Sequence, residues 1–144
     1  MSSIDRNILI RLHRNVGALD RKTARIAAKY KLTFSQFMVL EALYSKGNLT
    51  VGEVRRAILS SIGTISVIIN NLVKMGYIER LADATDKRVS ILQLTEAGHA
   101  VISNIVPENN AMIQNSFEVL THEEKMQLVN LLKVLGEQLD EENN

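Results

Sequence analysis

The 144-residue sequence contains no cysteine. This absence excludes disulfides, thiolate nucleophiles, cysteine-ligated zinc and regulation by thiol oxidation. The three histidines, His13, His99 and His122, lie far apart and lack the short helical spacing of a metal site. We therefore expect neither a metal nor a cofactor.

Long apolar runs are also missing. No segment approaches the ~18 apolar residues that span a bilayer, and the N-terminus lacks the apolar stretch of a signal peptide. Hydrophobic residues make up 46% of the chain and charged residues 23%, as in average globular proteins. The sequence thus predicts a folded cytoplasmic protein with no membrane partner.

Catalytic signatures are absent as well. The sequence has no glycine-rich phosphate loop, no nucleophile with a plausible histidine partner and no distinctive carboxylate pair. We therefore expect that the protein is not an enzyme.

What the sequence does contain is an uneven distribution of charge, although the net charge is only +1. Residues 5–31 carry eight basic and two acidic side chains, and residues 46–88 carry seven and four. From residue 96 onward, two basic side chains stand against nine acidic ones. The first two-thirds can face phosphate, but charged helix faces exposed to water also produce such a pattern.

Three helix starts share one pattern, a threonine followed three residues later by Glu or Gln, which satisfies the free N–H groups of a first turn. They are Thr33 with Gln36, Thr50 with Glu53, and Thr121 with Glu124. Apolar spacing predicts helices over residues 5–30, 34–44, 51–58 and 123–139. A further helix over residues 95–117 contains Pro107, so we expect a kink or break near Val106.

Residues 60–75 are rich in β-branched side chains, yet their spacing favours a helix. Ile65, Ile68, Ile69 and Leu72 fall at i, i+3, i+4 and i+7, and Gly76 stands where a helix usually ends. Beyond Gly76, residues 77–81 and 89–94 follow the strand period and flank a polar segment. The sequence predicts a mainly α fold with a small β-hairpin, in which residues 32–95 form a winged helix-turn-helix.

The outward face of the helix over residues 60–75 is small and polar. With the four apolar residues inward, a rotation of ~100° per residue places Gly63, Val67, Asn70 and Lys74 outermost. An ordinary solvated face usually carries Glu and Lys, so we favour contact with the major groove of DNA. The predicted contact residues are Ser61, Gly63, Thr64, Ser66, Val67, Asn70, Asn71 and Lys74.

The hairpin tip carries the predicted wing contacts. Arg88 is expected to enter the minor groove, because a narrow groove concentrates negative potential and guanidinium is more weakly hydrated than ammonium. Asp86 is expected to hold Arg88 in an ion pair, and Lys87 and Arg80 are expected to meet phosphate. The alternative is a solvated turn with incidental charges.

These residues resemble a known family, the multiple antibiotic resistance regulators or MarR family. Residues 32–40 look like its second helix, residues 61–66 like the start of its recognition helix, and residues 76–80 like the entry to its wing. The matches to its wing and following helix are Asp83, Asp86, Lys87, Arg88 and residues 94–98. Val67 departs from the pattern, since many members have arginine there, so base preference does not carry over.

The resemblance implies a dimer in which the first and last two helices of both subunits interlock on a pseudo-palindromic operator. It also implies a cleft for a small phenolic or anionic effector, which we expect to involve His13, Arg14 and Phe37. Basic residues of the first helix have two other interpretations: they line the DNA-facing side, or they pair with the acidic terminal helices.

Dimerisation has a separate argument from apolar surface. A winged domain of about sixty residues cannot cover the terminal helices alone, so a twofold partner is expected to bury them. The recognition helices then lie ~34 Å apart, one turn of DNA. The apolar residues concerned are Val101, Ile102, Ile105, Ile113 and Phe117.

The predicted organisation is one domain over residues 1–144, with residues 1–31 and 96–144 as the dimerisation region. The predicted function is sequence-specific transcriptional regulation by a homodimer, with repression favoured and a ligand as the releasing signal. The alternative is a winged-helix adaptor that binds protein and not DNA. Salt separates the two, because DNA binding weakens steeply as salt rises whereas an adaptor binds no duplex.

Overall fold

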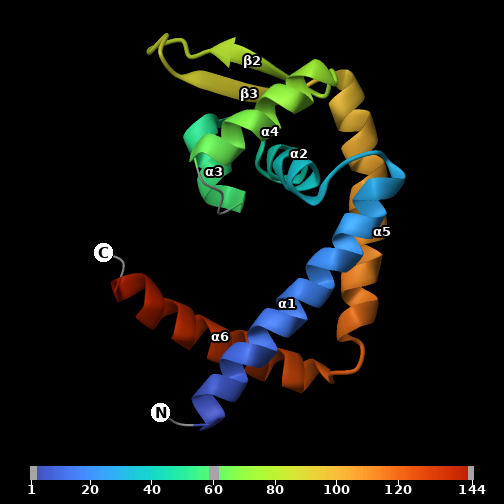
Figure 1. The fold of residues 1–144 in the computed structure, drawn as a ribbon, viewed down its shortest axis with the longest axis vertical. Coiled ribbons are helices and arrows are strands. Elements are labelled where there is room, and N and C mark those ends of the chain that lie inside the picture. The colour runs from blue at the N-terminus through green and yellow to red at the C-terminus, as the bar shows by residue number, and fades with distance from the viewer. Residues whose placement is uncertain (1–2, 59–61, 143–144) are drawn as a thin grey trace. The chain divides into compact units, whose positions relative to one another are not determined.

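The computed structural model describes residues 3–58 and 62–142, which form six helices and three short strands (Figure 1). They fall into two compact units, Met1–Asn110 and Ala111–Asn144, which we describe separately. The predicted fold class, mainly α with a small antiparallel sheet, is confirmed. The helices are α1 (Ser3–Lys29), α2 (Phe34–Lys46), α3 (Val51–Ile58), α4 (Ile62–Lys74), α5 (Glu96–Phe117) and α6 (His122–Glu142).

Reciprocal capping boxes begin three of these helices, as predicted. At α2 the Gln36 backbone N–H donates to Thr33 Oγ1 over 3.1 Å, and the Thr33 N–H donates to Gln36 Oε1 over 2.9 Å. The same two bonds join Thr50 to Glu53 before α3 and Thr121 to Glu124 before α6. Each box satisfies two N–H groups that a helix start leaves without partners.

The capping box of α3 is sensitive to acid. The Thr50 backbone N–H, followed by the Thr50 side chain and the Arg56 charge, holds the pKa of Glu53 below its ordinary value of 4.5. Because the folded-state pKa is lowered, the unfolded chain takes up this proton first as the pH falls. The stabilisation is complete above the ordinary pKa and is lost as the pH falls through the folded-state pKa.

We predict that Glu53→Gln removes this part of the acid sensitivity. Glutamine keeps an oxygen for the Thr50 N–H but does not titrate, as Gln36 shows in the box of α2. Urea unfolding gives the free energy of unfolding of both proteins at about pH 7 and about pH 3. We expect the difference in this free energy, wild type minus variant, to be smaller at the lower pH. An unchanged difference between the two proteins would contradict the prediction.

The sheet has three strands, β1 (Leu49–Thr50), β2 (Ile78–Ala82) and β3 (Ser90–Leu94), in the order β1-β3-β2. The β2–β3 hairpin is antiparallel, with Ile78 opposite Leu94 and Ala82 opposite Ser90. β1 pairs with β3 through Leu49 opposite Leu92. β1 could not be predicted from the sequence, because two residues are too few to show a strand period.

The core of the winged region joins α2, α3, α4 and the sheet, which lie together in Figure 1. Spacing prevails over β propensity in α4, since Ile65, Ile69 and Leu72 are fully buried. The other fully buried side chains of this core include Val39, Leu40, Val54 and Leu92. This packing fixes which face of α4 points outward.

Thr95 connects three elements where α4, the hairpin and α5 meet. Its backbone N–H donates to Tyr77 O over 3.0 Å, and its Oγ1 donates to Gly76 O over 2.6 Å and accepts from the Gly98 N–H over 3.0 Å. We call these three hydrogen bonds the Thr95 clamp. Gly76, just after α4, has a φ of 81°, and the Tyr77 N–H donates back to Leu72 O. This is a common way to end a helix, and the Thr95 clamp is bonded to these same two residues, Gly76 and Tyr77.

α5 corrects one prediction, because it runs unbroken from Glu96 to Phe117 with Pro107 inside it. The break expected near Val106 is therefore wrong, whereas the kink given as its alternative stays a prediction. Pro107 cannot donate to the Ser103 carbonyl and its ring crowds that group, but a helix with two turns or more on each side tolerates this cost when packing supports it.

A second correction concerns the apolar residues of α5. Ile102 and Ile105 are fully buried within the first unit, so they need no partner subunit. The Thr23 hydroxyl donates to Asn109 Oδ1 over 2.8 Å, and Lys29 forms an ion pair with Glu108. α1 therefore contacts α5 at Glu108 and Asn109.

Candidate nucleic-acid interface

The outward face of α4 has the composition expected from the sequence. Thr64, Ser66, Asn70, Asn71 and Lys74 are exposed. Val67, whose side chain is apolar, is 60% exposed. Gly63 lies in the first turn of α4, and Ser61 lies outside the described residues. The helix thus presents short side chains, one exposed apolar group and a terminal cation on one face.

Arg80, predicted to meet phosphate, also contacts this face from the hairpin. It lies on β2, and its Nη2 donates to Asn70 Oδ1 over 2.5 Å. Strand alternation puts Arg80 on the same side as buried Ile78, the side that packs against α4. Ten residues separate the two partners along the chain, so no local pattern in the sequence indicates this bond.

The loop between β2 and β3 is shaped by Asp83. Its Oδ2 accepts hydrogen bonds from Thr85 Oγ1 over 2.8 Å and from the Asp86 backbone N–H over 3.0 Å. The Thr85 bond is the main cause that lowers the pKa of Asp83, with the Asp86 N–H second. Sequence reasoning gave Asp83 no structural role, although an aspartate at the start of a polar turn is a known signal for this geometry.

Asp86 holds Arg88 in the manner predicted. Arg88 Nε donates to Asp86 Oδ1 over 3.1 Å, and the Arg88 backbone N–H donates to the same oxygen over 3.0 Å. The Arg88 side chain, followed by its backbone N–H, lowers the pKa of Asp86. The Arg88 side chain is still 91% exposed, so the ion pair orients the guanidinium without covering it.

Lys87, next to Arg88, is also exposed at this tip. The predicted wing residues are therefore gathered in one short loop, apart from Arg80, which lies farther back on β2. Asp83 fixes the turn of the loop and Asp86 orients Arg88, so the loop presents two cations at its tip. This arrangement is suited to a narrow, negatively charged groove.

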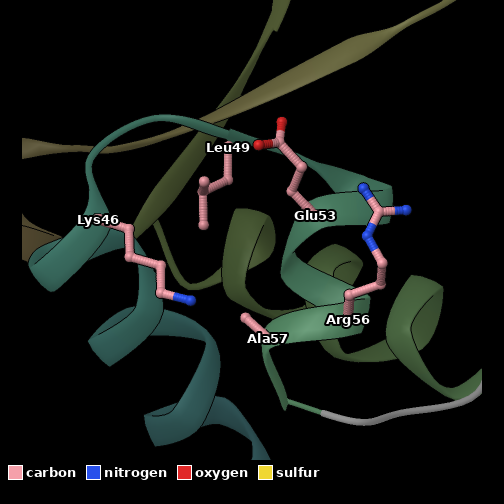
Figure 2. Close-up of a pocket in the computed structure, with 5 residues that line it drawn as sticks. All are labelled: Lys46, Leu49, Glu53, Arg56 and Ala57. Carbon is pink, nitrogen blue, oxygen red and sulfur yellow. The ribbon is translucent and has the colours of Figure 1, made fainter. Parts of the chain in front are cut away.

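The residues proposed for effector binding differ in exposure. Phe37 is 2% exposed and belongs to the core, whereas His13 and Arg14 are exposed on α1. None of the three lines the open groove of about 360 Å³ between the end of α2 and α3, which is lined by Lys46, Leu49, Glu53, Arg56 and Ala57 (Figure 2). Their role in ligand binding stays a prediction.

The histidines and acidic residues form no metal cluster in the described part of the chain. The His99 ring lies 5.5 Å from the Tyr44 ring, centroid to centroid, in a tilted contact between α5 and α2. Of the helices in residues 3–58 and 62–142, none is both long and apolar enough to cross a membrane.

Known proteins resemble this chain in sequence. The family model described as MarR family matches residues 30–89. The HTH-type transcriptional regulator MhqR of Bacillus subtilis is 33% identical over 108 residues, which are 75% of this chain and 74% of that protein. The sequence match thus extends beyond the winged region.

Solved structures agree. A mutant MarR from E. coli complexed with operator DNA has a TM-score of 0.74 and 26% identity, covering 90% of this chain and 96% of its own. BpsR of Bordetella bronchiseptica, from work on the regulation of its DNA binding by 6-hydroxynicotinic acid, has a TM-score of 0.74 and 27% identity, covering 90% and 91%. These relatives are transcriptional regulators and not enzymes.

Proposed function

This chain belongs to the MarR family of DNA-binding transcriptional regulators, and from that premise we propose that it is a homodimeric repressor of a pseudo-palindromic operator. In this proposal α4 lies in the major groove and the loop between β2 and β3 enters the adjacent minor groove. A small phenolic or anionic molecule releases the protein from DNA. Because its proposed partner is operator DNA, the proposed site of action is the cytoplasm.

The outward face of α4 is the observation that carries the proposal. Val67 is 60% exposed among small polar side chains, although an apolar residue gains nothing from water. A thymine methyl group in the major groove gives it an apolar partner, and Asn, Ser and Thr can pair with base edges around it. The E. coli relative solved with operator DNA supports DNA as the partner of this face.

Exposed apolar side chains support the homodimer, taken in each unit separately. In the first unit, Ile8, Leu9 and Val16 of α1 are each half or more exposed. In the second unit, Leu131, Val134 and Leu139 of α6 are more than half exposed. Apolar surface of this extent is typical of an interface, and a second copy of the chain is the partner that a palindromic operator requires.

The proposal of a releasing effector rests on one of the relatives. DNA binding by BpsR is regulated by 6-hydroxynicotinic acid, a small aromatic acid. With no cysteine in the sequence, a bound ligand is a direct way for a signal to reach this protein.

Footprinting on the promoter of the protein's own gene tests the proposal. We expect two protected half-sites about one helical turn apart, and a dimeric mass by light scattering at the same concentration. A protein that stays monomeric and protects no duplex at low salt would instead favour the adaptor function.

We predict that Arg88→Ala weakens operator binding by about 1–3 kcal/mol, because the braced guanidinium is lost from the minor groove. Thermal unfolding should not change, since the side chain is almost fully exposed. Arg88→Lys is the matched control, because it keeps the charge and loses the planar group. Unchanged affinity in Arg88→Ala would remove the wing from the mechanism.

A further inference from the structure

The hydrogen bond between Arg80 and Asn70 determines how one side chain of α4 can meet a base. An asparagine carboxamide has an accepting oxygen and a donating NH₂ group, and it can normally turn either one toward a partner. Arginine has only donors. Asn70 must therefore direct Oδ1 toward Arg80, as it does over 2.5 Å.

We propose that Arg80 is a positioning residue for base recognition: by holding Asn70 Oδ1, it makes Asn70 read the duplex as a hydrogen-bond donor. This inference rests on the proposed function, in which α4 lies in the major groove. It gives Arg80 a different role from the phosphate contact expected from the sequence.

The chemistry of the major groove gives this restriction a consequence. A bidentate contact with adenine needs both Oδ1 and Nδ2 turned toward the base, to accept from N6 and to donate to N7. In this structure Oδ1 is directed toward Arg80 on β2, which leaves Nδ2 as the group available to a base. Its partners are the acceptors O6 and N7 of guanine, O4 of thymine and N7 of adenine, whereas cytosine offers only a donor. Adenine is the poorer match, because its N6 amino group lies beside N7 and then receives no acceptor from Asn70.

The bond is expected to become stronger when DNA binds. Asn70 and Arg80 are both exposed, so water competes for the bond in the free protein. A duplex seated on α4 excludes that water, and a charge-assisted bond gains strength in a less polar environment. The backbone of Arg80 is also held in place, because β2 is paired along its length with β3.

The test is selection of binding sites from a duplex pool with a randomised core. Wild type is compared with Arg80→Met, which has no donor, and with Arg80→Lys, which keeps a charged donor of similar reach. Asn70→Ala identifies the base position that Asn70 reads. Lys87→Met is the matched control, because it removes a wing cation that has no bond to Asn70.

At the position identified by Asn70→Ala, we expect wild type and Arg80→Lys to favour guanine or thymine. Arg80→Met frees the carboxamide, so the preference should shift toward adenine by about fivefold or more. Lys87→Met should bind all sites more weakly with no shift in preference. Circular dichroism verifies that each variant is folded.

Other outcomes overturn the proposal in distinguishable ways. If Arg80→Met weakens binding evenly across sequences, Arg80 contacts phosphate and only the positioning role fails. If Asn70→Ala alters no preference, Asn70 does not read a base, and the positioning role fails again. If wild type selects nothing from the pool, the proposed DNA-binding function fails together with this inference.

Discussion

Replacing Gly98 with alanine is expected to destabilise the winged region by about 3 kcal/mol or more, a large fraction of the stability of a small domain. A Cβ at this position would lie 1.9 Å from Tyr77 O and 2.8 Å from Tyr77 C. These are backbone atoms, and the Thr95 clamp holds the same carbonyl in a hydrogen bond. To relieve the clash, α5 must move away from Tyr77, the residue before β2. That movement breaks the hydrogen bonds of the Thr95 clamp.

Thermal unfolding measures this effect, with an expected fall in Tm of roughly 10 °C. Gly52→Ala is the matched control, because a Cβ there meets only Arg56 Nη1 at 3.7 Å and Thr50 Oγ1 at 4.0 Å, which is ordinary contact. Its Tm should stay the same or rise slightly, since alanine favours helices over glycine. Equal Tm values for the two variants would mean that α5 and β2 are not packed as described.

Raising the salt concentration from about 50 mM to about 200 mM is expected to weaken operator binding about a thousandfold. Apart from Arg80, which is bonded to Asn70, the proposed interface carries three exposed cations per subunit, Lys74, Lys87 and Arg88, and a dimer presents both sets. Each neutralised phosphate releases condensed counterions, so six contacts give a slope of about −5 in a plot of log affinity against log salt.

Fluorescence anisotropy with a labelled operator gives this slope directly. The Lys87→Met variant should flatten it by about 2, one contact for each subunit of the dimer. An Arg21→Met variant on α1 tests the other interpretation of the basic first helix: an equal flattening would place α1 on DNA as well. A wild-type slope near zero would contradict binding through phosphate.

The elements of the winged region could be predicted from the sequence because their signals are local. Capping boxes are formed within four residues, and the inward stripe of α4 depends only on helical spacing. Ile65, Ile69 and Leu72 follow that stripe even though β-branched residues favour strands. The hairpin was recognised from its change of period, within one residue at each strand.

The remaining features depend on contacts between distant segments. β1 exists because Leu49 meets Leu92, and two residues cannot show a period on their own. Ile102 and Ile105 were assigned to a partner subunit, although both are buried within the chain. α5 also runs through Pro107, because a local penalty of about 3 kcal/mol does not outweigh the packing of a long helix.

In the candidate interface too, a contact within a short segment could be predicted from the sequence and a contact between distant segments could not. The ion pair between Asp86 and Arg88 was predicted because two residues separate its members. The bond between Arg80 and Asn70 was not, because it crosses from a strand to a helix. Sequence therefore indicates which side chains face outward, and the structure adds how one of them constrains another.

The Thr95 clamp also limits how a signal can act. One residue joins the segment after α4, the start of the hairpin and the first turn of α5, so we expect a movement of α5 to be passed to both α4 and the hairpin. In the proposed complex, we expect the major-groove and minor-groove contacts to be withdrawn together. A half-site should then be released in a single step, with no intermediate in which only the wing stays bound.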